Sequence, residues 1–167
     1  MSRTEILAII AGLLLLVLIS FYLLDKFGRN KKQKEVLKKL NTIGKIEKDG
    51  NAYFLLLGDK QIQIIFLSLK YDEYLTINSS SIMQIDRRKG RPLLIRYNYD
   101  HPPYKWLFVV PGINRVKRAL NESEVDFINY KTELPNFRVI KEDEVDLLIE
   151  EFLWRKETSS GLFFYLF

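Results

Sequence analysis

Four acidic side chains are the residues best able to do chemistry in this 167-residue chain: Asp59, Asp72, Glu73 and Asp86. Carboxylates that converge from neighbouring loops can hold a divalent metal ion, and such an ion activates water for hydrolysis. However, these four residues are scattered along the chain, and scattered acidic side chains usually contact only solvent. A metal-dependent hydrolase is therefore a function that the sequence allows, and we keep it as an alternative.

Few other residues suit catalysis. The chain has no cysteine and one histidine, His101, in a proline-stiffened loop, so a zinc site would need carboxylates for most of its ligands. Ser79, Ser80 and Ser81 follow a short predicted strand, and such side chains cap turns through hydrogen bonds to the backbone. Because the sequence also lacks a glycine-rich phosphate loop, a nucleophile elbow and a zincin helix, we predict no catalytic residue, metal or cofactor. The balance is against an enzyme.

A long apolar segment, residues 6–24, decides where the rest of the chain lies. It contains no charged side chain, and Ser20 and Tyr22 are its only polar ones. As a helix it would be about 28 Å long, close to the roughly 30 Å of hydrocarbon in a bilayer. The sequence therefore predicts one transmembrane helix over residues 6–24, after a short extracytoplasmic N-terminus of residues 1–5. A cleaved signal peptide is the alternative, but no small-x-small cleavage site follows the segment.

The charge that follows the apolar segment predicts its orientation. Basic residues exceed acidic ones by five between positions 25 and 39, which equals the net charge of +5 of the whole chain. Basic residues beside a membrane span stay in the cytoplasm. The sequence therefore predicts a protein of the cell membrane with its N-terminus outside and its bulk inside. Because the remainder of the chain is neutral, nucleic acid is not an expected partner.

Residues 25–41 are predicted to form a basic juxtamembrane helix with a narrow apolar stripe of Val36, Leu37 and Leu40. Two roles are compatible with this pattern. The stripe packs on the domain that follows, and the cations contact anionic lipid headgroups, where each basic residue contributes about 1 kcal/mol. The candidate membrane-surface residues of this segment are Lys26, Arg29, Lys31, Lys32 and Lys34.

Residues 42–157 are predicted to form one cytoplasmic α+β domain, with a mainly antiparallel sheet and an amphipathic C-terminal helix. Hairpin turns are indicated at residues 49–51, 58–60 and 87–92, where glycine tolerates positive φ between apolar strands. Residues 106–110 are continuously apolar and are bounded by prolines, which predicts a core strand.

The last third of the chain is less regular. Residues 114–120 are consistent with a short helix, and residues 124–130 suit a helix or a strand. Residues 142–156 have apolar side chains at helical spacing, an acidic first turn and a basic last turn, so they predict a helix. We expect Phe152, on the apolar stripe of this helix, to share one core with Trp106.

Residues 75–85, followed by the basic hairpin, resemble part of a pleckstrin-homology-type roll, several bacterial versions of which are tethered by a transmembrane helix. The resemblance covers residues 43–156 and implies a run of hairpins closed by a C-terminal helix. It also implies recognition of lipid headgroups by the basic hairpin, and it leaves residues 114–140 as an insertion.

The arrangement of a helix followed by three strands also resembles the restriction-endonuclease-like fold. That family places an Asp and a Glu-x-Lys motif on neighbouring strands to hold magnesium. Here Gln63 or Ile64 stands in the place of the Asp, and residues 76–78, Thr-Ile-Asn, stand in the place of the motif. None of the three catalytic residue types is kept, so this resemblance implies a catalytically degenerate relative.

Charge is segregated within the neutral domain. Residues 84–118 carry nine basic and two acidic side chains, whereas residues 119–157 carry eleven acidic and five basic ones. Two interpretations are open. The two regions face each other or face water, or residues 84–118 form a basic ledge that binds phosphate or an acidic partner. The candidate anion-binding residues of this ledge are Arg87, Arg88, Lys89, Arg91, Arg115, Lys117 and Arg118.

The C-terminal tail, residues 158–167, ends in six apolar residues, too few to span a bilayer. These residues could join the core or sheet edge of the domain, enter the inner leaflet of the bilayer, or dock on another protein. Because a Ser-Ser-Gly linker at residues 159–161 is expected to give them reach, we favour a partner or the bilayer over the domain's own core. The candidate partner-binding residues are Leu162, Phe163, Phe164, Tyr165, Leu166 and Phe167. The anchor, the aromatic-rich domain and the missing catalytic motifs together predict a membrane-anchored binding or adaptor domain, as an accessory subunit beside other membrane proteins.

Overall fold

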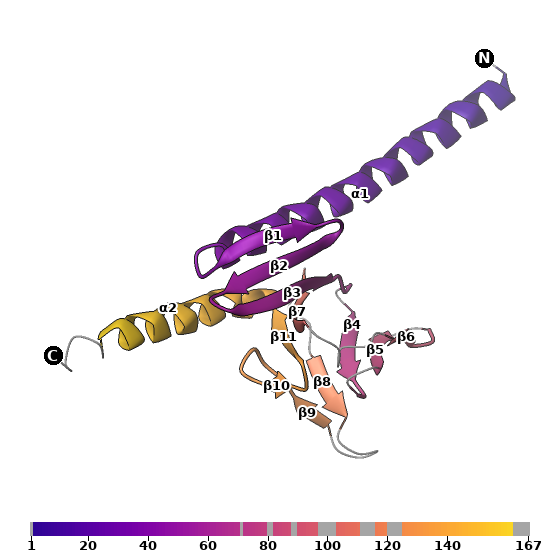
Figure 1. The fold of residues 1–167 in the computed structure, drawn as a ribbon. Coiled ribbons are helices and arrows are strands. Elements are labelled where there is room, and N and C mark those ends of the chain that lie inside the picture. Colours follow the sequence, from indigo (N-terminus) through magenta and orange to yellow (C-terminus); the bar gives the residue numbers. More distant parts are fainter. Residues whose placement is uncertain are drawn as a thin grey trace.

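The computed structural model describes residues 2–70, 72–79, 82–87, 90–96, 103–110, 116–119 and 125–161. A long N-terminal helix and a C-terminal helix accompany two mixed sheets (Figure 1). Most strand pairs in these sheets are antiparallel, so the predicted α+β class is confirmed.

Helix α1 (Arg3–Leu40) holds the apolar segment and the basic segment in one continuous helix. Its most apolar stretch has a mean hydropathy of 2.2, and none of that stretch is buried within the structure. Figure 1 shows this half of α1 projecting away from the sheets. Side chains such as Leu14 and Leu18 are 61% and 66% exposed, so the projecting half is both long enough and apolar enough to span a membrane.

Sheet A is the central layer of the domain. Its strands, in spatial order, are β1 (Lys45–Asp49), β2 (Ala52–Leu57), β3 (Lys60–Leu67), β7 (Tyr104–Val109), β11 (Phe137–Lys141) and β10 (Glu133–Leu134). Strand β7 runs parallel to both β3 and β11, and the other pairs are antiparallel. Gly50 and Gly58 occupy the first two hairpin turns with φ of 55° and 57°, which confirms both predicted turns.

Sheet B packs on one face of sheet A. Its strands, in spatial order, are β6 (Leu93–Arg96), β5 (Ile82–Arg87), β4 (Glu73–Ile77), β8 (Val116–Ala119) and β9 (Val125–Phe127). Only β4 and β8 are parallel neighbours in this sheet, as far as the structure describes it. The chain passes back and forth between the two sheets, so strands that are distant in the sequence lie side by side.

Strand β7, in the middle of sheet A, is buried on both faces, because apolar side chains project from both of its sides. Trp106, Phe108 and Val110 belong to a core cluster shared with the helices, whereas Leu107 and Val109 belong to a cluster shared with sheet B. Side chains alternate along a strand with a period of two, so one continuous apolar strand serves both cores. The predicted core strand at residues 106–110 is confirmed.

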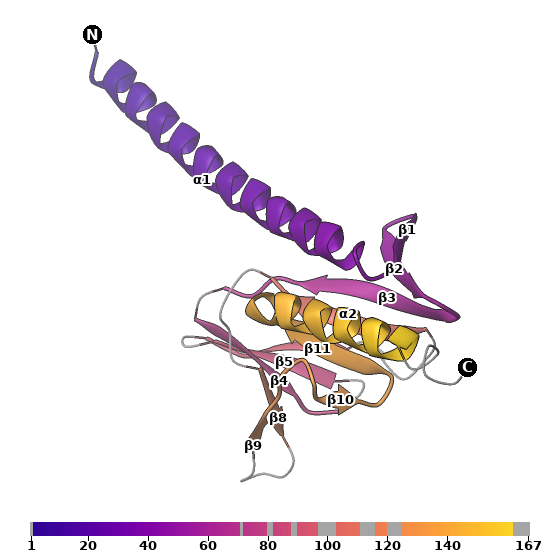
Figure 2. The same ribbon diagram turned by 90° about the vertical axis from the view of Figure 1, so that its left-hand side faces the viewer.

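Helix α2 (Val145–Gly161) follows the 3-10 turn η1 (Glu142–Glu144) and lies across the face of sheet A opposite sheet B (Figure 2). Val36 and Leu40, at the end of α1, are buried in the same cluster as Val145. The predicted packing of the juxtamembrane stripe on the domain is therefore confirmed.

The predicted short helix at residues 114–120 is wrong. Its described part forms strand β8, in which Val116 lies opposite Leu75 of β4, and both side chains are buried between the sheets. Burial in a sheet overrides a weak local preference for helix. The region at residues 124–130, for which the sequence leaves two possibilities, contains strand β9.

Three further features differ from expectation. Residues 159–161 form the last turn of α2 rather than a linker. Strands β10 and β11 occupy the region that the pleckstrin-homology-type resemblance leaves as an insertion. The parallel pairs of β7 with β3 and β11 also depart from the succession of hairpins on which that resemblance rests.

Candidate functional site

Glu73 and Asp86 lie on adjacent strands but point to opposite faces of sheet B. Glu73 is opposite Arg87, is 5% exposed, and accepts hydrogen bonds from Arg87 Nε at 3.0 Å and from the backbone N–H of Lys70 at 2.9 Å. Asp86 accepts a hydrogen bond from Thr76 Oγ1 at 2.5 Å on the outer face. Because successive residues of a strand face opposite sides, these two carboxylates do not converge on one metal ion.

The other two candidate carboxylates are exposed. Asp59 lies in the turn between β2 and β3, and Asp72 lies just before β4. Within the described ranges, no group of three acidic, histidine or cysteine side chains is arranged to hold a metal ion. Ser79 Oγ accepts a hydrogen bond from the backbone N–H of Ile82 at 3.1 Å, so this serine caps a turn as predicted. His101 lies outside the described residues.

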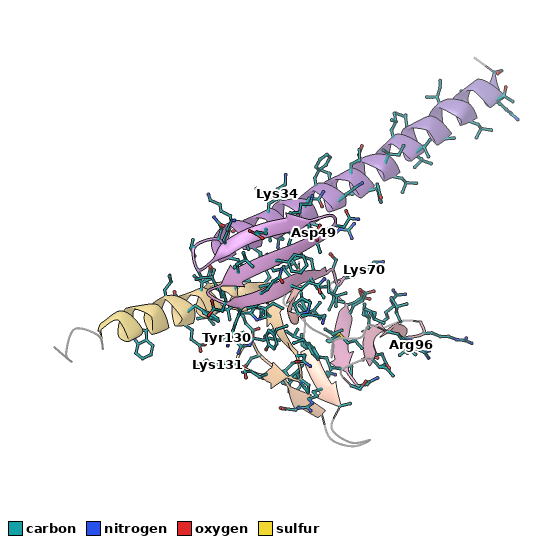
Figure 3. The ribbon with its side chains drawn as sticks, viewed as in Figure 1. Lys34, Asp49, Lys70, Arg96, Tyr130 and Lys131 are labelled. Atoms are coloured by element: carbon teal, nitrogen blue, oxygen red, sulfur yellow. The ribbon has the colours of Figure 1, made fainter. Side chains whose placement is uncertain are left out.

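The basic residues of α1 divide into two groups. Lys32 Nζ lies 2.6 Å from Glu142 Oε1, and Lys39 Nζ lies 2.7 Å from Asp146 Oδ1, so these two lysines tie α1 to η1 and α2. The remaining candidates on α1 (Figure 3 labels Lys34) are Lys26, Arg29, Lys31 and Lys34. Of these, the three lysines are exposed, so they are available to a membrane surface.

The described cations of the predicted basic ledge lie apart from one another. Arg87 pairs with Glu73, while Lys117 Nζ lies 5.3 Å from the ring centroid of Tyr74 on the outer face of sheet B. Arg118 follows Lys117 on the same strand and therefore faces the opposite side, and β4 separates this strand from β5. Arg91 is exposed just before β6. Three candidates lie outside the described residues: Arg88, Lys89 and Arg115.

The apolar tail at residues 162–167 also lies outside the described residues. Helix α2, which precedes it, ends at Gly161. Figures 1 and 2 both show this end of α2 on the side of the molecule opposite the projecting half of α1. The tail therefore begins on the side of the domain opposite the apolar segment.

A cavity of about 650 Å³ lies between α2 and sheet A. Its apolar lining is formed by Leu57, Ile62, Tyr104, Trp106 and Phe152. Its polar lining is formed by Lys60, Gln61, Glu133, Arg138 and Glu151. The volume falls in the range of roughly 300 to 1,000 Å³ that is typical of ligand pockets, and so does the combination of an apolar wall with a few polar groups.

The strand register builds the wall of this cavity. Ile62 of β3 lies opposite Tyr104 of β7, and Trp106 of β7 lies opposite Arg138 of β11. Residues two apart on a strand share a face, so these side chains all project toward α2. Phe152 comes from α2 on the other side, with its ring centroid 5.5 Å from that of Trp106. The cavity therefore depends on two parallel strand pairs and one helix.

An ion pair and a tyrosine set the electrostatics of the cavity. Arg138 bonds to Glu133 across the β10–β11 hairpin, and the Arg138 side chain is only 13% exposed. The Nε atom of Arg138 is buried and has no hydrogen-bond partner in the structure. Burial raises the pKa of Tyr104 above its ordinary value, and the nearby Arg138 offsets part of that increase. Tyr104 therefore stays neutral at physiological pH.

The lining of this cavity is balanced in charge, with two acidic and two basic residues. Among the described residues, it contains no histidine, cysteine or serine. The sequence predicts that Trp106 and Phe152 share one core, and this is confirmed, with Phe152 partly buried against the cluster that contains Trp106. No local pattern in the sequence predicts that Arg138 lies beside Trp106. No family model, curated protein or solved structure matches the chain.

Proposed function

We propose that the protein is a single-pass membrane protein whose α+β domain binds a segment of a partner protein beside the cytoplasmic face of the membrane. It acts as an adaptor or as an accessory subunit of a membrane complex. Residues 6–24 form the span, the short N-terminus lies outside, and the domain lies inside.

The observation that carries this proposal is the continuity of α1. Residues 6–24, in its projecting half, are apolar apart from Ser20 and Tyr22, and large side chains there are exposed, while Val36 and Leu40 at the other end of α1 are buried in the domain core. Lys32, which pairs with Glu142 of the domain, lies eight positions after Leu24, which corresponds to about 12 Å of helix. The domain is therefore held directly beneath the membrane, without a flexible linker.

Charge supports the orientation. The basic residues of α1 follow directly after the apolar half, and such residues are retained on the cytoplasmic side during insertion. Protease added to intact cells should therefore spare the domain, whereas protease added to opened cells should digest it. Digestion of the domain from outside would overturn the orientation.

The cavity supports binding of a partner segment. Its wall of aromatic and aliphatic side chains fits an apolar or aromatic side chain, and the charged residues around it can pair with flanking polar groups. Gln61 and Lys60 are exposed parts of the lining, so a segment can reach it from solution. The partner side chain would pack against Trp106 and Phe152.

The apolar tail supports a partner rather than the bilayer. Six residues reach at most about 20 Å when fully extended, whereas α2 alone carries the chain about 25 Å. The tail begins at the end of α2 that lies away from the projecting half of α1, so it starts on the side of the domain that faces away from the proposed membrane. A partner protein within its reach is the simpler target.

Site-specific photocrosslinking in native membranes tests the binding site. A photoreactive residue at Gln61, in the cavity lining, should yield one discrete protein adduct from the full chain. The matched position is Glu150, which is exposed on α2 but does not line the cavity, and a photoreactive residue there should yield none. Equal adducts at both positions, or none at Gln61 in a folded protein, would contradict this site.

A further inference from the structure

Strand β6 forms one edge of sheet B and exposes apolar and basic side chains together. Leu93 is 46% exposed and Leu94 is 52% exposed. Arg91 and Arg96 flank these leucines and are also exposed. Among the described residues, neither arginine has an ion-pair partner. Large exposed leucines between two available guanidinium groups are a pattern typical of surfaces that bind anionic membranes.

The register of β6 places an apolar side chain on each face of this edge. Leu94 lies opposite Gln84 on the outer face of sheet B, whereas Leu93 lies opposite Ile85 and faces the other side. Ile95, opposite Met83, packs on the core and holds the strand in place. The edge is therefore a fixed ridge with leucines on both sides, and edge strands usually avoid such exposure by carrying charges.

The direction of α1 brings this ridge toward the membrane. In Figure 1, β6 is the edge of sheet B on the side toward which the apolar half of α1 projects, and β9 is the far edge. Figure 2 agrees, since the β8–β9 end of sheet B points away from that half of α1. In Figure 3, Arg96 lies at the end of the domain that is nearer to the projecting half of α1, whereas Lys131 lies at the opposite end.

We propose that the β6 edge, formed by Arg91, Leu93, Leu94 and Arg96, docks on the headgroup layer of the membrane that α1 spans. The arginines meet lipid phosphates, and the two leucines enter the boundary between headgroups and acyl chains. This inference rests on the membrane anchor of the proposed function but not on its partner-binding cavity. Because the end of α1 is packed on the domain and joined to it by ion pairs, the ridge is held near the bilayer, so weak contacts suffice for docking. Two attachment points then fix the rotation of the domain about α1.

The absence of cysteine makes single-site labelling of the full chain straightforward. We would introduce Leu94→Cys, with Phe127→Cys as a matched exposed site on the far strand β9 and Leu16→Cys as a site within the apolar half of α1. Each variant is labelled with a fluorophore and reconstituted in vesicles of phosphatidylcholine with or without phosphatidylglycerol. Quenching by nitroxide-bearing lipids then reports the contact of each label with the bilayer.

Docking predicts strong quenching at position 16, clear quenching at position 94 in vesicles with phosphatidylglycerol, and little at position 127. Quenching at position 16 with equal, weak signals at positions 94 and 127 would overturn the docking alone. Absence of quenching at position 16 would overturn the anchor and the docking together. A label at position 94 that is shielded from water but not quenched by lipid would indicate a protein on this edge, which also overturns the proposal.

Charge neutralisation provides the second test. Arg91→Gln and Arg96→Gln should each lower the bilayer contact of the label at position 94 by about fivefold, because each arginine loses its attraction to anionic lipid. Lys131→Gln changes an exposed cation at the opposite end and should leave the contact unchanged. An equal effect of all three changes would mean that net charge, rather than this edge, produces the signal, and would overturn the proposal.

Discussion

The rings of Trp106 and Phe152 meet at a centroid distance of 5.5 Å with an angle of 56° between their planes. Trp106 comes from the central strand of sheet A and is 1% exposed, while Phe152 comes from α2. The contact joins the C-terminal helix to the sheet and also forms the apolar wall of the cavity. The stability of the domain and the proposed binding at this cavity therefore involve the same pair of side chains.

We expect Phe152→Ala to lower the free energy of unfolding of the domain by about 3 kcal/mol, because it removes a ring packed on the core. The matched control is Phe127→Ala, which removes a 61% exposed ring and should cost less than about 1 kcal/mol. Urea denaturation of the full-length protein in detergent micelles measures both. Equal costs would show that α2 does not pack on Trp106 in solution.

The junction between α1 and the domain should depend on apolar contacts more than on charge. Leu40 is fully buried, so Leu40→Ala should cost about 2 to 5 kcal/mol. Lys39→Ala removes the ion pair with Asp146, whose two side chains are 36% and 67% exposed, and should cost less than about 1 kcal/mol. The same denaturation assay compares them, and a larger cost for Lys39→Ala would contradict the packing described for α1.

Gly44 lies where the chain leaves α1 and enters β1, and it has no room for a side chain. A Cβ at this position would collide with the carbonyl oxygen of Leu56 and would lie 2.7 Å from Leu57 Cδ2. We therefore expect Gly44→Ala to destabilise the domain by several kcal/mol. Gly28→Ala is the control, because nothing lies within 4 Å of a Cβ there, and alanine favours helix by up to about 1 kcal/mol. Thermal unfolding should separate the two variants clearly.

The raised pKa of Tyr104 predicts a loss of stability at alkaline pH. In the unfolded chain the phenol has its ordinary pKa of about 10, whereas burial raises the pKa in the folded state. The contribution of neutral Tyr104 to stability is therefore complete below about pH 10 and is lost as the pH rises through the folded pKa. Tyr104→Phe should show a shallower decline in denaturation midpoint above pH 10 than the parent. Parallel declines would contradict the effect of burial.

Removal of residues 162–167 should leave the domain folded and weaken its association with a partner. The reason is that α2 carries the start of this tail away from the projecting half of α1. Thermal unfolding of the truncated chain should match that of the full chain, while co-purification of the crosslinked partner from native membranes should fall. A truncation that lowers the unfolding temperature would show that the tail belongs to the core.

The sequence by itself determined the features that depend on local pattern. Residues 6–24 carry no charge and are apolar apart from Ser20 and Tyr22, which specifies a long exposed helix whatever the rest of the chain does. Gly50 and Gly58 permit the positive φ of the first two turns, and the helical spacing near Phe152 predicts α2. Each signal is contained within a few consecutive residues, so it can be interpreted without knowledge of the fold.

The tertiary structure alone decided the features that join distant segments. Strand β8 exists because Val116 is buried against Leu75, although its own residues are also consistent with a helix. Arg138 lines the cavity because β11 pairs in parallel with β7, and parallel pairing leaves no turn signal in the sequence. Glu73 and Asp86 are both candidate metal ligands by residue type, but the alternation of side chains along the paired strands sends them to opposite faces of sheet B.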